Sequence, residues 1–554
     1  MKLKALFTVI IISGLIISAG CQPSVSLVPT PAFTYAEWNL DYLAIKYDGA
    51  GNQLWVARYN GPGNNADSAD ALALDDDGNV YVTGASHGSR DSGIRTDYAT
   101  IKYDSNGNEL WVARYEGPTG SDVSARALAV DGDGNVYVTG NYATIKYDNG
   151  GNELWVARHD ETGASISEIK TLALDSDGNV YITGTSRGDS GHDDYVTIKY
   201  DSNGSQLWLA RYDDGSPTAL AVDTAGNVYV TGFSRANNDI NGYLTIKYDN
   251  AGNQLWTAAY NFPGYGGHIA YALAVDDTGN VCVTGRSYSA HVSDYATVKY
   301  DSQGNELWVA RYNGPGDSSD QANSLTVDAD GNVYVTGKSN DKNRDFDYAT
   351  LKYSSDGKIL WEARYEGPGN DNDMATALEV DDFGNVYVTG RSHGNNSGWD
   401  SATVKYNGKG KQLWAARYNG PGNSTDEATA IAVDAEDNVY ITGRSVGTAG
   451  VLITNQSPWP DVPVYTDPGK VVETRVGLEF AFGFETVTRL PGGWEESHDE
   501  NIVSLVGNEL VMNQTSGTVS GTTWYSFKAL KLGETRITFK LGERETKEFR
   551  IKIE

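Results

Sequence analysis

The sequence predicts an all-β protein, in which a β-propeller is followed by a small immunoglobulin-like β-sandwich. Three observations favour this fold class. The 554 residues include 63 Gly, 35 Tyr and 13 Trp, a composition typical of short strands joined by tight turns. The segment Val-Tyr-Val-Thr-Gly, or a close variant, recurs eight times between residues 80 and 443. A second segment, which contains Leu-Trp-Val-Ala-Arg-Tyr in its fullest form, also recurs eight times, about 51 residues apart.

The first 21 residues have the pattern of a secretory signal. Lys2 and Lys4 precede an apolar run from Leu6 to Ile17, and small residues lead to Cys21. This ending resembles a bacterial lipoprotein signal, which implies that a lipid is attached to Cys21 and anchors the protein in a membrane. We therefore expect an extracytoplasmic lipoprotein, at the cell surface or in the periplasm, with residues 22–40 as a tether. An ordinary cleaved signal is the alternative.

Residues 41–447 are predicted to form the propeller. Each repeat contains four strand-like runs, for example residues 71–75, 79–84, 98–104 and 109–115, and leaves no room for a helix of normal length. The region starts with the last two runs of a repeat and ends with the first two. If these halves pair and close the ring, the propeller has eight blades and no open sheet edges at its ends. Without that pairing it has seven.

The repeated segments resemble a known family. GNVYVTG at residues 78–84 and DYATIKYDSNGNELWVARY at residues 97–115 are similar to the SBBP repeats of bacterial extracellular β-propellers. The resemblance implies the propeller architecture and leaves the ligand open.

The acidic turns between the first two strands of each repeat are interpreted as hairpin turns. All eight begin with Asp and seven keep Gly-Asn, as in Asp-Asp-Asp-Gly-Asn at residues 75–79. A calcium loop that starts at Asp75 would need Gly at position 80 and Glu at position 86, where the chain has Val80 and Ser86. We expect no dedicated metal site and no cofactor, and leave weak Ca²⁺ binding along these turns open.

Three other repeated residue types are predicted to have structural roles. They are the lysine of Ile-Lys-Tyr, the arginine of Ala-Arg-Tyr in seven of eight copies, and the tryptophan before it. A role that recurs in every blade fits paired charges and packing between blades better than binding. Cys282 replaces a repeated tyrosine and is expected to be a buried strand residue.

The connections between the second and third strands vary most, from twelve residues (85–96) to Asn141 alone. Variable loops on a rigid scaffold are where binding usually occurs. We therefore expect a surface protein or a glycan to bind there, and not nucleic acid, which the net charge of −30 would repel. The candidate residues are His87, Arg90, Arg187, His192, Arg235, His291, Arg344, His393 and Trp399.

The sequence does not predict an enzyme, and no catalytic residue is assigned. The seven histidines are scattered, and the chain contains no phosphate-binding loop. The run Tyr-Asp-x-x-Gly-x-x-x-Trp resembles the tryptophan-docking motif of eight-bladed quinoprotein dehydrogenases. Those enzymes usually have a vicinal disulfide, and this chain contains no Cys-Cys pair. A quinoprotein-like enzyme is kept as a second alternative.

The repeats end before a proline-rich linker at residues 448–470. In the last segment, residues 471–554, apolar and polar residues alternate in short runs, which is typical of the strands of a β-sandwich. SFKALKLGETRITFKL, at residues 526–541, resembles the chagasin-like inhibitors of cysteine peptidases, which implies that three loops enter a papain-like active site. A purely adhesive or structural module is the alternative. The candidate inhibitory residues are Pro491, Gly492, Gly493, Trp494, Gly517, Ser520, Gly521, Trp524 and Arg544.

Overall fold

The computed structural model describes residues 40–447, with gaps, and eight strands beyond them. The gaps are residues 64, 89–94, 119–120, 160–165, 189–190, 237–239, 262–266, 290–291, 344, 370, 396 and 422. Within these described residues, no helix has the length and apolarity needed to cross a membrane.

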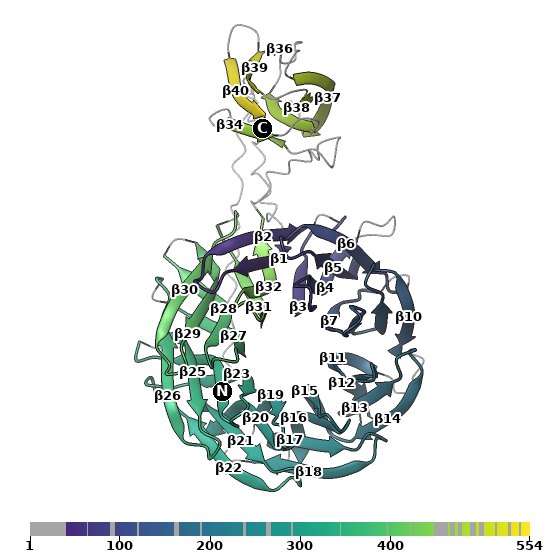
Figure 1. Ribbon diagram of the computed structural model, residues 1–554, viewed down its shortest axis with the longest axis vertical. Helices are drawn as coiled ribbons and strands as arrows, with labels where there is room; N and C mark the ends of the chain where they lie inside the picture. The colour runs from purple at the N-terminus through teal and green to yellow at the C-terminus, as the bar shows by residue number, and fades with distance from the viewer. Residues whose placement is uncertain are drawn as a thin grey trace, which may run out of the picture. The chain divides into compact units, whose positions relative to one another are not determined.

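Residues 40–446 form eight antiparallel sheets of four strands, arranged in a ring (Figure 1). We number the sheets as blades I to VIII and letter the strands of each blade a to d, from the ring axis outward. The strands of blades I to IV are β3 (Ser68–Leu74), β4 (Val80–Gly88), β5 (Arg95–Tyr103), β6 (Glu109–Tyr115), β7 (Ala125–Val130), β8 (Val136–Gly140), β9 (Ala143–Tyr147), β10 (Glu153–Arg158), β11 (Ile166–Leu174), β12 (Val180–Arg187), β13 (Asp193–Tyr200), β14 (Gln206–Tyr212), β15 (Gly215–Val222), β16 (Val228–Ala236), β17 (Ile240–Tyr248) and β18 (Gln254–Tyr260).

The other four blades repeat this plan. Their strands are β19 (Ile269–Val275), β20 (Val281–Ser289), β21 (Val292–Tyr300), β22 (Glu306–Tyr312), β23 (Asp320–Val327), β24 (Val333–Asn340), β25 (Phe346–Tyr353), β26 (Ile359–Tyr365), β27 (Asp373–Val380), β28 (Val386–Gly394), β29 (Gly398–Tyr406), β30 (Gln412–Tyr418), β31 (Asp426–Val433), β32 (Val439–Val446), β1 (Leu40–Tyr47) and β2 (Gln53–Tyr59).

Blade VIII closes the ring with strands from both ends of the region. Its strand order is β2-β1-β32-β31, so the two terminal half-repeats share one sheet. The closing strands pair without a break from Leu40 opposite Val446 to Tyr47 opposite Val439. The prediction of eight blades is therefore confirmed, and the seven-bladed alternative is wrong.

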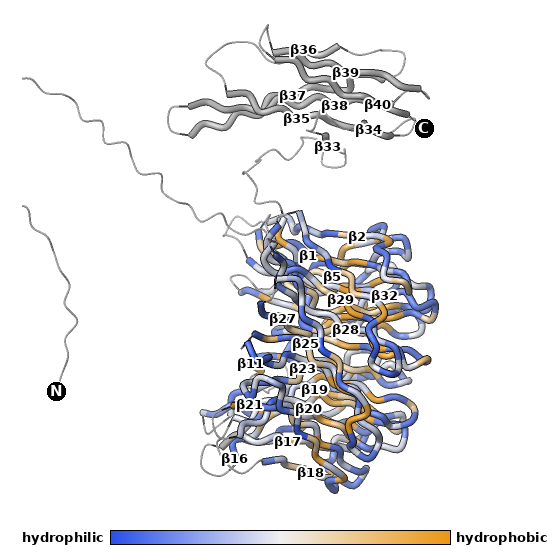
Figure 2. Tube along the Cα trace, turned by 90° about the vertical axis from the view of Figure 1, so that its left-hand side faces the viewer, coloured by the Kyte–Doolittle hydropathy of each residue, from blue (hydrophilic) through white to orange (hydrophobic). Residues whose placement is uncertain are grey.

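The hydrophobic cores lie between neighbouring blades. The Val-Tyr-Val-Thr-Gly part of β4 is fully buried, because a β-strand places alternate side chains on opposite faces and each face meets another blade. Tyr81 of blade I, for example, shares a core cluster with Val136 and Val138 of blade II. Figure 2 shows this pattern as apolar strands in the body of the ring and polar connections at its edges.

Each repeated tryptophan docks on the next blade, as predicted. The indole of Trp55 on β2 donates a hydrogen bond of 3.1 Å to the carbonyl oxygen of Ser105. Gly107, two residues on in that turn, has φ +85°, and a Cβ there would lie 2.7 Å from the Trp55 ring. Only glycine fits this close approach and this backbone conformation.

Two opposite faces of the ring differ in their connections. The turn face carries the short a–b and c–d turns, such as residues 75–79 and 104–108. The loop face carries the b–c and d–a connections, such as the one between Gly140 of β8 and Ala143 of β9. The a–b turn of blade VIII has Asp437 where seven blades have Gly, and Asp437 adopts φ 70° there.

Beyond the propeller, eight strands form two further sheets. Their orders are β33-β35-β38-β37 and β34-β40-β39-β36. The strands are β33 (Val464–Tyr465), β34 (Val471–Thr474), β35 (Glu479–Val487), β36 (Glu495–Ser497), β37 (Val503–Thr515), β38 (Thr518–Ala529), β39 (Gly533–Leu541) and β40 (Glu545–Ile553).

Candidate ligand-binding face

The aspartates of the turn face hold their own turns. Asp75 Oδ1 accepts hydrogen bonds from the backbone amides of Asp77 and Asn79, at 3.1 and 2.8 Å. Its Oδ2 accepts from the Tyr81 hydroxyl at 2.8 Å and lies 3.5 Å from Lys102 Nζ. These contacts oppose the effect of burial and keep the pKa of Asp75 below its usual value. The hairpin interpretation of these turns and the structural role of the lysine are confirmed.

Blade V lacks the tyrosine of this arrangement. Cys282 takes its place on β20 and is fully buried, as expected. Lys299 Nζ lies 3.2 Å from Asp276 Oδ2. Burial raises the pKa of the Cys282 thiol to about 12, so the thiol stays protonated at neutral pH.

An acidic crevice of about 270 Å³ separates the a–b turns of blades I and II. Asp75, Asp76, Asp77, Asp131 and Asp133 line it. Within the described part of the chain, no three His, Cys, Asp or Glu side chains are arranged to hold a metal ion.

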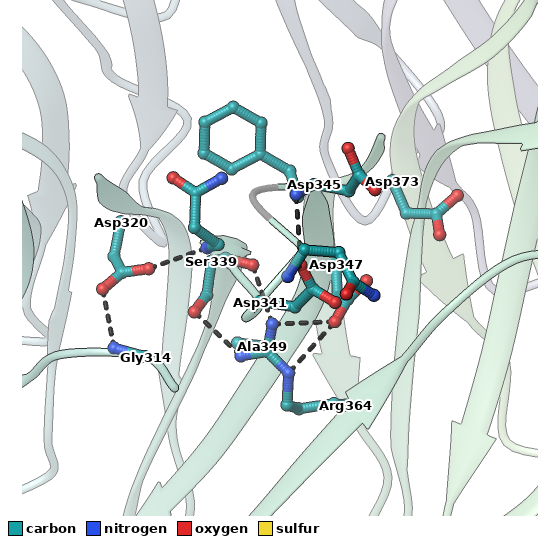
Figure 3. A network of polar contacts seen from close by, with 12 residues as sticks. Gly314, Asp320, Ser339, Asp341, Asp345, Asp347, Ala349, Arg364 and Asp373 are labelled. Atoms are coloured by element: carbon teal, nitrogen blue, oxygen red, sulfur yellow. Dashed lines mark hydrogen bonds and ion pairs between the residues drawn. The ribbon is translucent and has the colours of Figure 1, made fainter. Parts of the chain in front are cut away.

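The repeated arginines brace the loop face. In blade VI, Arg364 Nη2 donates to Asp347 Oδ2 at 2.8 Å, and Nη1 donates to Ser339 Oγ at 2.8 Å (Figure 3). Arg364 also donates to the hydroxyl of Tyr312 in blade V, at 3.0 Å. The predicted structural role of these arginines is therefore confirmed. The same ion pair recurs as Arg58–Asp41, Arg114–Asp97, Arg311–Asp294 and Arg417–Asp400.

Blade IV lacks both residues of this pair. Ala259 replaces the arginine, as the sequence shows, and Gly242 stands opposite Ser234 where Asp347 stands opposite Ser339. Loss of both charges avoids leaving one of them buried without a partner.

Four of the loop candidates that the structure describes form two contacting pairs. His192 and Arg235 meet at 2.7 Å between Nδ1 and Nη1, and the rings of His393 and Trp399 lie 5.5 Å apart. His87 is partly buried at the end of β4, and Arg187 is exposed at the end of β12. Three other candidates lie outside the described residues: Arg90, His291 and Arg344.

Among the candidate inhibitory residues, Ser520, Gly521 and Trp524 lie on β38. Gly521 pairs with Met512 of β37 and Thr486 of β35. The other candidate inhibitory residues lie outside the described residues: Pro491, Gly492, Gly493, Trp494, Gly517 and Arg544. Cys21 also lies outside them.

A cluster of cations on the loop face was not predicted from the sequence. Arg286, Lys338, Arg391 and Arg444 follow the Thr-Gly of strand b in blades V to VIII. The same position holds Ala85, Asn141, Thr185 and Phe233 in blades I to IV. A comparison of the repeats position by position would have shown this difference between the two halves of the ring.

Aromatic rings lie beside three of these cations. The guanidinium carbon of Arg286 is 5.9 and 5.8 Å from the ring centres of Tyr271 and Tyr288. Lys338 Nζ is 4.7 Å from the ring centre of Phe346. Arg391 stacks on Trp399 with 4.5 Å from its guanidinium carbon to the ring centre. Such contacts favour a positive charge but do not neutralise it.

Glu427 neutralises the other end of the cluster. It accepts from Arg444 Nη2 at 2.6 Å and forms an ion pair with Arg391. Burial opposes ionisation of Glu427, but the two arginines hold its pKa below the usual value. Glu427 therefore stays charged at neutral pH.

These features define an eight-bladed β-propeller with one specialised sector on its loop face. A family model described as "Beta-propeller repeat" (SBBP) matches residues 110–141, 161–191, 307–343 and 413–448. The chain therefore carries SBBP propeller repeats, as the sequence resemblance implied.

Other similarities are more limited. The regulatory protein FlaEY of Caulobacter vibrioides is 32% identical over 143 residues, which cover 21% of this chain and 15% of that protein. A solved structure of the Dos1 propeller is 12% identical, covers 73% of this chain and 95% of its own, and has a TM-score of 0.48. The structure of the periplasmic gluconolactonase PpgL of Pseudomonas aeruginosa is 15% identical and has a TM-score of 0.35. The match covers 60% of this chain and 98% of that structure. None of these similarities bears on the activity of this chain.

Proposed function

We propose that this protein is an extracytoplasmic scaffold that binds a surface protein or a glycan through the loop face of its propeller. The observation that supports this function is the cation cluster of blades V to VIII, and above all its members in blades V and VI. Charges with a structural role recur around the ring beside their carboxylates, whereas Arg286 and Lys338 have no carboxylate partner among the described residues. A feature confined to one sector of a repeat protein is what a ligand site requires.

The test is to block each face separately. In a Cys21→Ser background, Asn343→Cys places a thiol on the loop face, and Gln303→Cys places one on the turn face; both positions are exposed. Each variant is labelled with a polyethylene glycol maleimide, which buried Cys282 does not react with in the native protein. Binding is then screened against arrays of surface polysaccharides and envelope proteins. The label at position 343 should abolish binding that the label at position 303 leaves intact, and equal effects would contradict the proposal.

The propeller is proposed to be held at a membrane through a lipid on Cys21. The signal-like segment before this cysteine supports the proposal.

No catalytic residue is assigned to the scaffold. Quinone-dependent oxidation is the competing function, and cofactor absorbance in the purified protein would reveal it.

A second proposed function concerns the C-terminal region. Its resemblance to chagasin-like inhibitors supports an immunoglobulin-like module that blocks papain-like cysteine peptidases. The full chain at micromolar concentration should slow papain, and Trp494→Ala with Gly517→Pro should weaken that effect. If the full chain does not slow papain, the inhibitor proposal fails and the C-terminal region is an adhesive or structural module.

A further inference from the structure

The three cations Arg286, Lys338 and Arg391 occupy one position in three consecutive blades. Each stands opposite a residue of strand a in its own blade, and these partners are Ile269, Gln321 and Met374. None of the partners carries a charge. In blade VIII the same strand-a position holds Glu427, which serves both Arg391 and Arg444. The carboxylate that balances the cluster is therefore at one end, and the sector around Arg286 and Lys338 keeps its positive charge.

This excess charge is costly where it lies. Arg286 is partly buried, and its Nε is a buried donor with no hydrogen-bond partner among the described residues. Burial, together with the positive charges of Arg391 and Arg286, lowers the pKa of Lys338. A partly buried cation without a partner destabilises a fold, and a chain with net charge −30 has carboxylates to spare. The arrangement is explained if an external anion completes it.

The surroundings of the cluster favour a polar ligand over a protein partner. Protein interfaces usually depend on apolar anchors at their centre. In the part of the chain that the structure describes, every large hydrophobic side chain that is well exposed belongs to an outer strand d or to the turn at Phe383 on the turn face. The loop face offers instead two guanidinium groups, an ammonium group and four aromatic rings.

We infer that Arg286, Lys338 and Arg391 form a binding site for the carboxylate or sulfate groups of an acidic polysaccharide. This inference rests on the proposed scaffold function and narrows its ligand to one class. The planar guanidinium group of Arg286 can hold two oxygens of one anionic group, and Lys338 in the next blade supplies a point charge. Arg391, which already pairs with Glu427, adds positive charge at the end of the site. Because the cations repeat from blade to blade, a polymer with regularly spaced anionic groups can engage them together.

The experiment uses the full chain and four soluble probes in calorimetric titrations. Oligogalacturonate tests carboxylates, dextran sulfate tests sulfates, neutral dextran tests the sugar alone, and poly-glutamate tests an acidic peptide. Lys338→Gln and Arg286→Gln remove charges from the cluster. Lys358→Gln is the matched control, because it removes the same charge from the turn face, where Lys358 is 79% exposed. Lys338→Arg keeps the charge.

We expect at least one acidic saccharide to bind, neutral dextran not to bind, and Lys338→Gln and Arg286→Gln each to weaken binding at least tenfold. Lys358→Gln and Lys338→Arg should stay within about threefold of the wild type. The melting temperature of Lys338→Gln should not fall, because an unpaired cation is removed.

Equal losses in Lys338→Gln and Lys358→Gln would overturn the site, and tighter binding of poly-glutamate would overturn the ligand class. If neither acidic saccharide binds but the array screen finds a ligand of the loop face, this inference fails and the scaffold function stands. If the array screen finds none, the scaffold function fails as well.

Discussion

The indole nitrogen of Trp414 donates a hydrogen bond of 3.0 Å to the carbonyl oxygen of Gly49, 365 residues away in the chain. Trp414 belongs to blade VII and Gly49 to the c–d turn of blade VIII, so this contact is one of the bonds that close the ring. The same contact joins Trp55 of blade VIII to Ser105 of blade I. Blade VIII is therefore held on both sides by the docking interaction that joins the other blades.

The docking glycines should be intolerant of a side chain. Gly107→Ala places a Cβ against the Trp55 ring in a left-handed backbone conformation, and we expect it to lower the free energy of unfolding by about 2–3 kcal/mol. Gly132→Ala is the matched control, because a Cβ added at Gly132 would have no atom within 4 Å. Urea denaturation of both variants gives the comparison. Equal stability of the two would contradict the docking role.

The arginine–aspartate pair should be more costly to break than to remove. Arg364→Ala leaves the buried carboxylate of Asp347 without its guanidinium partner, and we expect a loss of about 3 kcal/mol. The double variant Asp347→Gly with Arg364→Ala reproduces the natural residues of blade IV and should lose less. A double-mutant cycle by denaturation measures the coupling. Additive losses would show that the pair is not coupled.

Blade II should be a source of acid sensitivity. His159 is buried at the position where blade I has Tyr115, and burial lowers its pKa to about 3. Because the unfolded imidazole takes up a proton near pH 6.5 and the folded one does not, stability is complete above that pH and is lost as the pH falls. Between pH 7 and pH 5 this loss should be about 2 kcal/mol.

His159→Tyr should remove that loss, since tyrosine does not titrate in this range. The measurement is the free energy of unfolding at pH 7 and pH 5 in both proteins. The same decrease in variant and wild type would assign the acid sensitivity to other groups.

Cys21 should carry the membrane anchor. In a bacterial host, the wild-type chain should incorporate radiolabelled palmitate and remain with the membrane fraction. Cys21→Ser should do neither, because the acceptor thiol is gone. Cys282→Ser is the control and should leave labelling unchanged. Labelling of Cys21→Ser would place the lipid elsewhere.

The propeller could be predicted from the sequence because every blade uses the same contacts and therefore repeats the same residues. Eight tryptophans and eight Asp-initiated turns predicted the number of repeats, and the unmatched halves at each end favoured one shared sheet, with seven blades as the alternative. The cation cluster could not be predicted in the same way. Lys338 and Arg364 lie in the same repeat, and only the structure shows that Arg364 pairs with Asp347 while Lys338 lies over the Phe346 ring. Which charge has a partner depends on contacts between strands and blades, not on one segment.

The pairing of Leu40 with Val446 also has a mechanical consequence. The chain enters β1 and leaves β32 at the same end of two antiparallel strands. If the preceding segment is tethered and the following segment is pulled, the force opens the strand pair one hydrogen bond at a time, from Leu40 toward Tyr47. Strands loaded in this way separate at lower force than strands that slide past each other. A load on the chain would therefore reach the propeller first through the β1–β32 pair of blade VIII.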